Sequence, residues 1–595
     1  MTHRSTVTLV AEQSAQVPTT GGRASAAWAL GLLAVIVAAP GLANGFAFDD
    51  LPIVRDNPRV HSLAGPWSYL TESYWHWTHC CAAYRPLSIW LFSLEWVAGG
   101  GAPWVFHAVN IALMAAVVVG VFRLARHLMG ARAAWVAAAL FAVHPVHVEA
   151  VANVVGQEEI VLACLTLSAV LAYLAARRRG TPTPGMRLGL AGLVSIAPLA
   201  KEQGFVLPLL LLAAELTLVR DPNTWTRRFR ALAPTYALMF LGLVLVGAAR
   251  TAVLGGLGAG VIAPSIERLD FGGRMLVGLQ SVPSWARLLV WPSHLQANYS
   301  PPAYGLESTL GLRELGGVAL LAGVVLALPS TWRRRPPIAF GLLWSVLTLA
   351  PVSNVAFPTG LIIAERTLFL PSVGVVLAVA ALADAFWPTA TRLPRQLRAA
   401  AIAVVALVLV AGGVYTAGRQ RVWKSNDVLF AQTVRDAPDS YAAHWVYANW
   451  LDEQGATATA LQSYREAVRL YQGDPKLYED YGHVLRRTGS CREAVGQFVR
   501  ALALDPTRTV ARARLFECRM AIGDYVGARD AVAHEVANGH QEYARMLARA
   551  DQAIAAGADS ASTPTTMSLT RRPHPQRAGG PPELPSASNE SRDAE

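Results

Sequence analysis

Long apolar segments with few charged residues recur through the first 420 residues of this chain. The hydrocarbon core of a bilayer is about 30 Å thick, so a helix that crosses it needs about 20 mostly apolar residues. The pattern therefore predicts an all-α, polytopic membrane domain over residues 26–420 with about eleven spans. The predicted spans are 26–44, 104–122, 133–146, 159–176, 187–200, 204–219, 231–249, 312–328, 337–352, 366–386 and 399–416.

The net charge of +11 could indicate a nucleic-acid partner, but the basic residues are not gathered on one face. They form short clusters between the apolar segments, at 177–179, 227–230, 333–335 and 392–398. Cytoplasmic loops of membrane proteins carry such an excess of lysine and arginine. The charge therefore indicates topology, and no nucleic-acid partner is expected. With 53% hydrophobic and 15% charged residues, the chain is also too apolar for a soluble protein of its length.

With the basic clusters inside, residues 1–25 are a cytoplasmic tail and the first span leads outward. Two large loops, 45–102 and 251–311, then lie outside. The apolar segment 275–291 is expected to lie on the membrane or dip into it, because a full crossing would place the 333–335 cluster outside. The odd number of spans puts the C-terminal part on the outer face.

A second domain is predicted after residue 421, where a 34-residue repeat becomes visible. A glycine in a turn and small residues where paired helices touch are typical of tetratricopeptide repeats. We therefore expect a short α-solenoid of about three repeats over 425–555, followed by a disordered tail over 556–595. The residues that repeat are Gly455, Gly489 and Gly523, Ala460, Ala494 and Ala528, Tyr464 and Phe498, and Ala467 and Ala501.

The five cysteines show no metal-ligand spacing. Cys491 falls at the repeat position that Tyr525 occupies 34 residues later. Cysteine is often a small buried residue, so we expect Cys491 to pack in the solenoid core without a redox role.

Charged residues and histidines lie at the outer ends of several predicted spans. Each alone has an ordinary explanation, such as a helix cap or an ion pair of small energetic weight. Together they indicate a reaction centre for a substrate that carries a phosphate. A carboxylate would take a proton from an acceptor hydroxyl, and a cation would stabilise the leaving phosphate. The residues are Asp49, Asp50, His144, His147, Glu149, Lys201, Glu202, Glu365 and Arg366.

Five segments of the chain resemble the transmembrane and tetratricopeptide-repeat protein O-mannosyltransferases. They are FDD at 48–50, YRPL at 84–87, FAVHPVHVEAV at 141–151, AKEQG at 200–204 and AERTLFLPS at 364–372. The resemblance covers about residues 26–555 and implies a GT-C membrane glycosyltransferase. Such an enzyme would move a sugar, here mannose, from a polyprenyl-phosphate donor to hydroxyls of protein acceptors, with inversion at the anomeric carbon.

The resemblance also implies roles for the polar residues. Asp49 is the expected general base, and Asp50 would position Asp49 or the acceptor. Arg366 is the first candidate for the donor phosphate, because a guanidinium offers a fork of donors, with Lys201 and Arg85 in reserve. The supporting polar residues are His144, His147, Glu149, Glu202 and Glu365. We predict no obligatory metal, although these side chains could hold a divalent ion.

The composition, rich in alanine and arginine with short loops, looks bacterial, which predicts an inner-membrane protein whose site and repeats face the periplasm. The repeats would bind the acceptor or a partner protein, or else dimerise the enzyme. Two other functions stay open. The same chemistry could serve a lipid-linked glycan or a cell-envelope polymer, or the chain could be a non-catalytic membrane scaffold.

Overall fold

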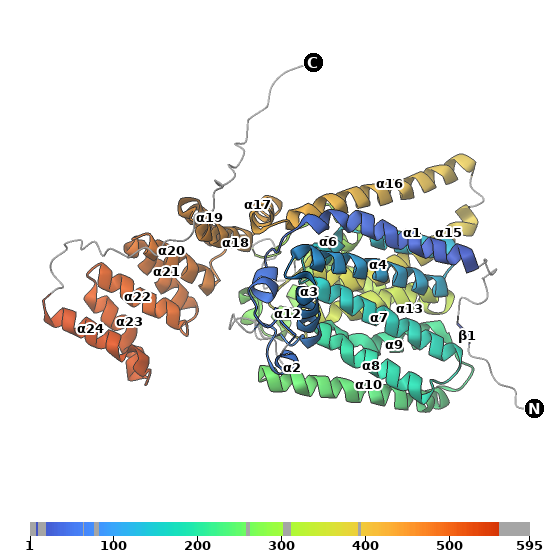
Figure 1. The fold of residues 1–595 in the computed structure, drawn as a ribbon, viewed down its shortest axis with the longest axis horizontal. Coiled ribbons are helices and arrows are strands. Elements are labelled where there is room, and N and C mark those ends of the chain that lie inside the picture. The colour runs from blue at the N-terminus through green and yellow to red at the C-terminus, as the bar shows by residue number, and fades with distance from the viewer. Residues whose placement is uncertain are drawn as a thin grey trace, which may run out of the picture. The chain divides into compact units, whose positions relative to one another are not determined.

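The computed structural model describes residues 8–9, 20–63, 65–75, 83–256, 262–301, 311–390 and 394–557. The chain forms two compact units that divide between Ala443 and His444. The first unit is a bundle of long helices, coloured blue to yellow in Figure 1. The second is a series of short helices, coloured orange to red.

The first unit contains seventeen α-helices in its described part, most of them in the bundle (Figure 1). They are α1 (Thr20–Ala38), α2 (Pro66–Thr71), α3 (Pro86–Gly99), α4 (Pro103–Leu128), α5 (Ala131–Ala142), α6 (Val148–Ala152), α7 (Gln157–Arg178), α8 (Pro184–Ala200), α9 (Leu207–Leu218), α10 (Trp225–Leu254), α11 (Pro264–Glu267), α12 (Phe271–Val290), α13 (Leu312–Arg334), α14 (Pro336–Leu349), α15 (Phe369–Ala390), α16 (Arg395–Gln420) and α17 (Asn426–Asp436). A two-stranded antiparallel pair joins β1 (Thr8–Leu9) to β2 (Val219–Arg220) beside the start of α10.

Seven described helices are long and apolar enough to cross a membrane, and an eighth span results if α5 and the helix that follows it, bent by 50°, count as one. Three of the eleven predicted spans fall on shorter helices, α8, α9 and α14. Segment 275–291 forms α12, which does not meet the length and composition criteria for a span. The membrane-spanning architecture is therefore clear, and the count of about eleven stays a prediction.

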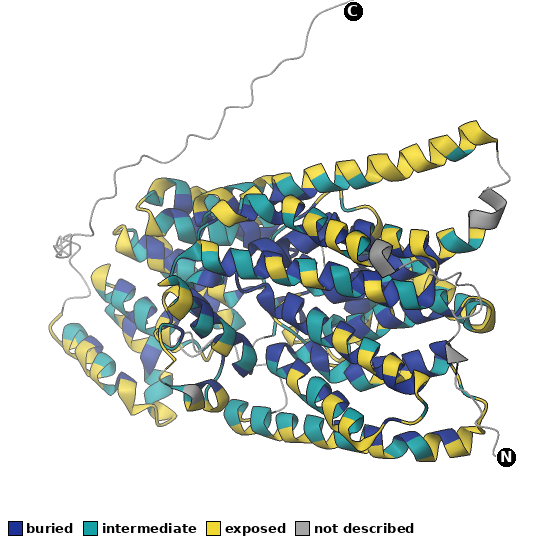
Figure 2. Ribbon diagram, turned by 45° about the vertical axis from the view of Figure 1, so that its right-hand side comes forward, coloured by how far each residue is buried: buried dark blue, intermediate teal, exposed yellow. Residues whose placement is uncertain are grey.

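Alanine and glycine let the central helices pack closely. Ala134, Ala137 and Ala138 of α5 are fully buried. Where α14 meets α15, a Cβ added to Gly374 would lie 2.4 Å from the carbonyl oxygen of Gly341, so only glycine fits there. Small residues at such contacts are how membrane helices gain packing without a hydrophobic driving force. The buried residues concentrate in the middle of the bundle, whereas α16 and α10 at its edges are largely exposed (Figure 2).

The second unit repeats a pair of helices. The pairs are α18 (Tyr441–Glu453) with α19 (Thr457–Leu470), α20 (Pro475–Arg487) with α21 (Cys491–Leu504), and α22 (Thr509–Ala521) with α23 (Tyr525–Ala537), followed by α24 (Ala544–Ala555).

The residues that define the 34-residue period occupy equivalent places in these pairs. The glycine in the turn of each pair has a positive φ, of 81° at Gly455, 84° at Gly489 and 80° at Gly523, which favours glycine over other residues. Ala460, Ala494 and Ala528 are fully buried. The paired helices thus follow the 34-residue period, and their assignment to the tetratricopeptide class stays a prediction.

The structure differs from the predicted bounds of the repeat region and describes little of the predicted tail. The helix α17 lies inside the predicted repeat region 425–555, but it groups with the first unit. Asp436 at the end of α17 forms an ion pair with Arg419 near the end of α16. The predicted disordered tail, 556–595, lies outside the described residues from position 558 onward.

The expected role of Cys491 as a plain core residue is wrong. Cys491 at the start of α21 forms a disulfide with Cys518 near the end of α22, 27 residues along the chain. Cys518 is fully buried, whereas Cys491 is only half-buried. The sequence pattern missed the pairing because the two cysteines stand at different repeat positions and meet only when α21 packs on α22.

We expect replacement of both Cys491 and Cys518 by serine to destabilise the repeat unit. Closing a loop of this size restricts the unfolded chain and contributes about 2–4 kcal/mol. In the full-length protein in detergent, the melting temperature of the repeat unit should therefore fall by several degrees. Dithiothreitol should lower the melting temperature of the wild type by the same amount. The control is Cys164→Ala in the first unit. Unchanged melting in the double variant would contradict the disulfide.

Candidate active site

The two adjacent acids follow the first span. The chain leaves α1 through the 3₁₀ helix η2 (Ala39–Ala43) and reaches Phe48, whose φ of 54° is left-handed and strained for a residue with a side chain. Two contacts hold this loop: the Phe48 N–H donates to Asn426 Oδ1 at 2.7 Å, and the Gly45 N–H donates to the Lys424 carbonyl at 3.0 Å. Strained backbone of this kind persists only where its surroundings hold it, and it concentrates at functional sites.

Asp50 fastens the loop from inside. Its Oδ2 accepts the Ala47 N–H at 3.1 Å and its Oδ1 accepts the Val155 N–H at 3.0 Å, and its side chain is almost fully buried. Burial raises the pKa of Asp50 to about 7, and these backbone hydrogen bonds oppose the rise. One oxygen therefore closes the loop that carries the acids and the other joins this loop to the turn before α7, which holds the adjacent Asp49 in place.

Asp49 reaches a different partner. Its Oδ2 lies 3.2 Å from Nη1 of Arg366, and 16% of its side chain is exposed. The same Nη1 lies 3.5 Å from Oε1 of Glu149, whose other oxygen accepts the Arg366 backbone N–H at 2.8 Å. Three segments far apart in sequence thus meet at one guanidinium. Within the described part of the chain, Nε and Nη2 of Arg366 have no hydrogen-bond partner.

Arg85, by contrast, is fully engaged. Its Nη2 lies 2.8 Å and its Nε 3.1 Å from Glu202 Oε2, while its Nη1 donates to Glu158. Its guanidinium carbon also lies 5.3 Å from the centre of the Tyr74 ring. Burial acts to lower the pKa of Arg85, but the charges of Glu158 and Glu202 outweigh burial and raise it well above its usual value.

Lys201 is also paired, with the buried carboxylate of Glu159. Of the two guanidinium groups expected to bind phosphate, Arg85 has a carboxylate on every nitrogen, whereas Nε and Nη2 of Arg366 have no partner in the described part of the chain. The assignment of the donor phosphate to Arg366, with Lys201 and Arg85 in reserve, stays a prediction.

Sequence reasoning missed Glu158 and Glu159, the acids that hold Arg85 and Lys201. A signal was present, since Gln157, Glu158 and Glu159 open the otherwise apolar helix α7. Acids are stabilised at a helix N-terminus, and charges at the edge of a span are costly without partners. With both included, five carboxylates surround three cations: Asp49, Glu149, Glu158, Glu159 and Glu202 around Arg85, Lys201 and Arg366.

Three of the expected supporting residues contact other neighbouring groups instead of the acid pair. His144 Nε2 lies 3.0 Å from the Leu289 carbonyl oxygen, and His147 Nε2 lies 2.8 Å from Ser372 Oγ. Glu365 accepts the Tyr299 hydroxyl at 2.6 Å. Glu149 and Glu202, by contrast, contact the site cations directly.

A second network of buried side chains supports the turn before α7, whose Val155 N–H binds Asp50. Gln157 Nε2 donates to Glu95 Oε1 at 2.7 Å and to Asn110 Oδ1 at 3.0 Å, and Asn110 Nδ2 donates to the Asn153 carbonyl at 3.1 Å. Burial raises the pKa of Glu95 to about 8, although the bond from Gln157 lowers it. A neutral Glu95 suits a site without a nearby cation, and the network joins α3, α4 and α7.

Among the described residues, no three of His, Cys, Asp and Glu are placed to hold a metal ion together. The side chains that could have completed a shell are committed elsewhere, since His144 and His147 bind a backbone carbonyl and a serine hydroxyl. That no metal is obligatory stays a prediction.

The raised pKa of Asp50 gives a pH dependence with a defined sign. An aspartate with a pKa of about 7 in the folded protein, against 3.8 ordinarily, binds its proton more tightly when folded. Its contribution to stability is complete below about pH 4 and is lost as the pH rises through 7. We expect the apparent melting temperature of the wild type to fall over this range relative to Asp50→Asn. Parallel curves for the two proteins would contradict the burial argument.

Comparisons with known proteins show which families the chain resembles. Residues 84–248 match the family described as dolichyl-phosphate-mannose-protein mannosyltransferase. Protein O-mannosyl-transferase TMTC3 of Mus musculus is 25% identical over 498 residues, which cover 78% of this chain and 53% of that protein. Protein O-mannosyl-transferase TMTC1 of Homo sapiens is 28% identical over 505 residues, covering 76% and 56%. The chain thus spans about half the length of these relatives.

Among solved structures, the crystal structure of ArnT from Cupriavidus metallidurans bound to undecaprenyl phosphate aligns with a TM-score of 0.33 and 13% identity, covering 85% of this chain and 81% of that one. Similarity at this level carries no argument about fold or ligand. The family match covers residues 84–248, which include Arg85 and Lys201, and the match to TMTC3 covers 78% of the chain. They confirm the resemblance that the motifs predict: over about three quarters of its length, the chain is similar to the protein O-mannosyl-transferases.

Proposed function

We propose that this protein is a GT-C-type membrane glycosyltransferase that transfers mannose from a polyprenyl-phosphate donor to hydroxyls of protein acceptors. Two lines support this. The chain is similar to protein O-mannosyl-transferases over most of its membrane unit. Its residues also place a partly exposed carboxylate beside a guanidinium with unoccupied donors.

In this proposal Asp49 is the general base. It takes the proton from the acceptor hydroxyl as the oxygen attacks the anomeric carbon. The bond between that carbon and the phosphate oxygen breaks, and the polyprenyl phosphate leaves with the bonding electrons. Attack opposite the leaving group inverts the anomeric carbon. Arg366 stabilises the negative charge that develops on the phosphate.

The shared Nη1 of Arg366 is the single observation that carries the proposal. Asp49 lies on one nitrogen of the guanidinium, so a phosphate on Nε and Nη2 would lie next to the base without displacing it. A guanidinium fork binds phosphate oxygens in pairs. The sugar carbon attached to that phosphate would then face the hydroxyl that Asp49 deprotonates, as the reaction requires.

Carboxylates outnumber cations in this site, so a bound phosphate needs a cation that still has N–H donors to offer it. Arg85 and Lys201 are neutralised by carboxylates, and the charges of Glu158 and Glu159 also act on Arg366. Glu149 binds both the backbone N–H and the side chain of Arg366, which fixes the guanidinium in position. In our proposal Glu149 orients the phosphate-binding residue, and Arg85 and Lys201 hold the loops around it.

We place the site and the repeats on the outer face of a bacterial inner membrane, with undecaprenyl phosphate as the carrier. The positive clusters between spans support this orientation. The disulfide between Cys491 and Cys518 supports it too, because disulfides persist in oxidising compartments such as the periplasm. The repeats would present an acceptor polypeptide or a partner, since solenoids offer extended grooves. Dimerisation through the repeats, and transfer to a lipid-linked glycan or envelope polymer, remain alternatives.

Substitutions at Asp49 and Arg366 test the proposal in reconstituted membranes, with polyprenyl-phosphate mannose and a serine- and threonine-containing peptide. We expect Asp49→Asn to lower kcat by about 10²–10⁴, the usual contribution of a general base. Arg366→Lys should raise the donor KM by at least about tenfold, because lysine cannot form the paired contact. Both variants should reach the membrane at the wild-type level.

The controls are Asp56→Asn and Arg55→Lys, since these two residues pair with each other at the surface of the same loop. Both controls should retain wild-type rates. An unchanged donor KM in Arg366→Lys would move the phosphate to Lys201 or Arg85. Full activity in Asp49→Asn would refute its role as base, and a deletion strain fully rescued by Asp49→Asn combined with Asp50→Asn would favour the scaffold.

A further inference from the structure

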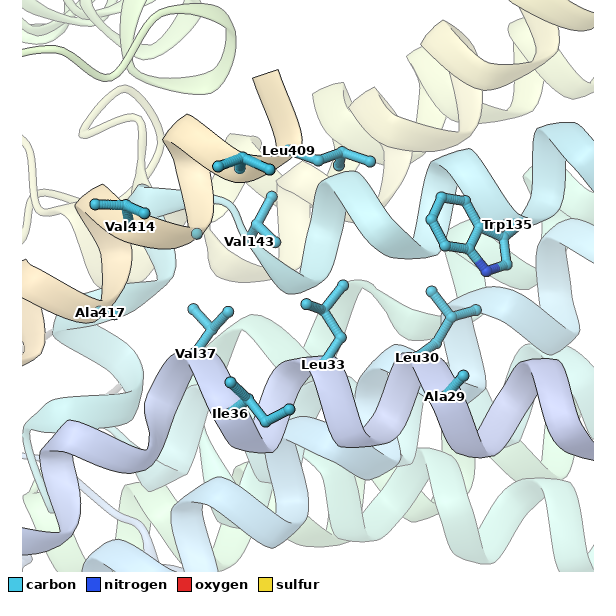
Figure 3. A pocket seen from close by; sticks show the side chains of 12 residues that line it. Ala29, Leu30, Leu33, Ile36, Val37, Trp135, Val143, Leu409, Val414 and Ala417 are labelled. Atoms are coloured by element: carbon cyan, nitrogen blue, oxygen red, sulfur yellow. The ribbon is translucent and has the colours of Figure 1, made fainter. Parts of the chain in front are cut away.

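An apolar groove of about 530 Å³ lies between α1, α16 and the end of α5 (Figure 3). All twelve residues that line it have nonpolar side chains. Leu33 and Val37 of α1 point across it toward α16, as Figure 3 shows, and Val143 closes one side. The indole N–H of Trp135 is the one side-chain hydrogen-bonding group among these residues, and so apolar a surface disfavours a polar ligand and suits a hydrocarbon chain.

The groove lies along α16, one of the helices at the edge of the bundle. The apolar part of α16 has no buried residues, so the outer side of the groove is formed by a helix that the rest of the protein leaves exposed. The lining residues run from Ala29 to Val37 on α1 and from Leu409 to Ala417 on α16. Each stretch covers about 12 Å at the helical rise of 1.5 Å per residue. The groove is therefore a slot that follows the direction of the spans.

One end of the slot adjoins the candidate active site. The Val143 carbonyl accepts a hydrogen bond from Thr416 Oγ1 at 2.8 Å, and Gln420 at the end of α16 accepts one from Asn44 Nδ2 at 2.9 Å. Asn44 lies in the loop that carries Asp49. The helix α16 also contacts α6, which carries Glu149. The slot thus leads from the membrane to the segments that hold the acid and its guanidinium.

We propose that this groove binds the first isoprenoid units of the polyprenyl-phosphate donor. The inference rests on the proposed function and adds the place where the lipid part of the donor is held. In such a donor the chain begins at the carbon bonded to the phosphate oxygen, so it must leave the reaction site directly as a single hydrocarbon strand. A single slot that begins beside the acid loop meets this requirement. A phospholipid has two chains joined by a polar glycerol and would fill the slot with one chain only.

Gly413 allows the groove to be blocked without disturbing the helix. A Cβ added there would lie 3.6 Å from Val37 Cγ2 and 3.7 Å from Val143 Cγ1, which is ordinary contact, so a leucine side chain would extend into the slot. Gly418, on the same helix, is exposed and has nothing within 4 Å of its added Cβ. Gly413→Leu and Gly418→Leu therefore form a matched pair. Ala417→Leu, at the end near the acid loop, is a second blocking variant.

The test uses undecaprenyl phosphate as the probe and the full-length protein in detergent. Its concentration is raised while the apparent melting temperature is recorded. We expect the lipid to stabilise the wild type and Gly418→Leu at the same concentrations. Gly413→Leu and Ala417→Leu should need at least about tenfold more lipid for the same rise, because the side chain occupies space that the chain would fill. Inorganic phosphate should not distinguish the four proteins.

Equal lipid requirements in all four proteins would overturn the groove as the isoprenoid site and leave the donor class of the proposed function intact. No stabilisation of the wild type by undecaprenyl phosphate would refute both. Equal stabilisation by a two-chain phosphatidylglycerol would make the groove an ordinary lipid contact. A change of oligomeric state in Gly413→Leu, measured by light scattering, with an unchanged lipid requirement would make it a helix interface; either result contradicts the proposal.

Discussion

The guanidinium of Arg366 is the point at which the membrane unit joins its polar residues. It contacts Asp49 of the first loop and Glu149 of α6, and it begins the segment that leads into α15. A charge held among apolar helices is costly unless it is paired, and removing one partner of a buried pair costs about 3–5 kcal/mol. The segments that carry Asp49, Glu149 and Arg366 must therefore come together, because any one of these charges left unpaired would destabilise the fold. The same requirement brings a carboxylate and the N–H donors of a guanidinium into one corner.

The neighbouring contacts keep this corner in place. Asp50 uses both oxygens on backbone N–H groups, so the strained turn at Phe48 and the turn before α7 cannot move independently. Behind that turn, Gln157 links Glu95 to Asn110. Arg85, just before α3, forms ion pairs with Glu158 and Glu202 and so fixes the start of α3 to these acids. An enzyme that must align a base, a sugar carbon and a leaving group benefits from supports of this kind, because small displacements of reacting atoms are expensive.

Much of this organisation could be predicted from the sequence, for reasons that are local. Span positions follow from apolar length, and the helical pairs follow from the spacing of Gly455, Gly489 and Gly523. The approach of Asp49 and Arg366 was expected because both lie at outer ends of predicted spans. Partner choice was not predictable. Lys201 pairs with Glu159, and Cys491 pairs with Cys518, because of how helices pack, and spacing along the chain does not encode that. The histidines misled for the same reason: His144 and His147 were expected to support the acid pair, but they bind Leu289 and Ser372.

A cryo-EM structure of the full-length protein with undecaprenyl phosphate would locate the phosphate directly. We expect phosphate density on the Nε and Nη2 edge of Arg366, at hydrogen-bond distance of about 3 Å, with Asp49 beside it on the other nitrogen. Density at Arg85 or Lys201, with Arg366 still paired only to Asp49 and Glu149, would contradict this expectation.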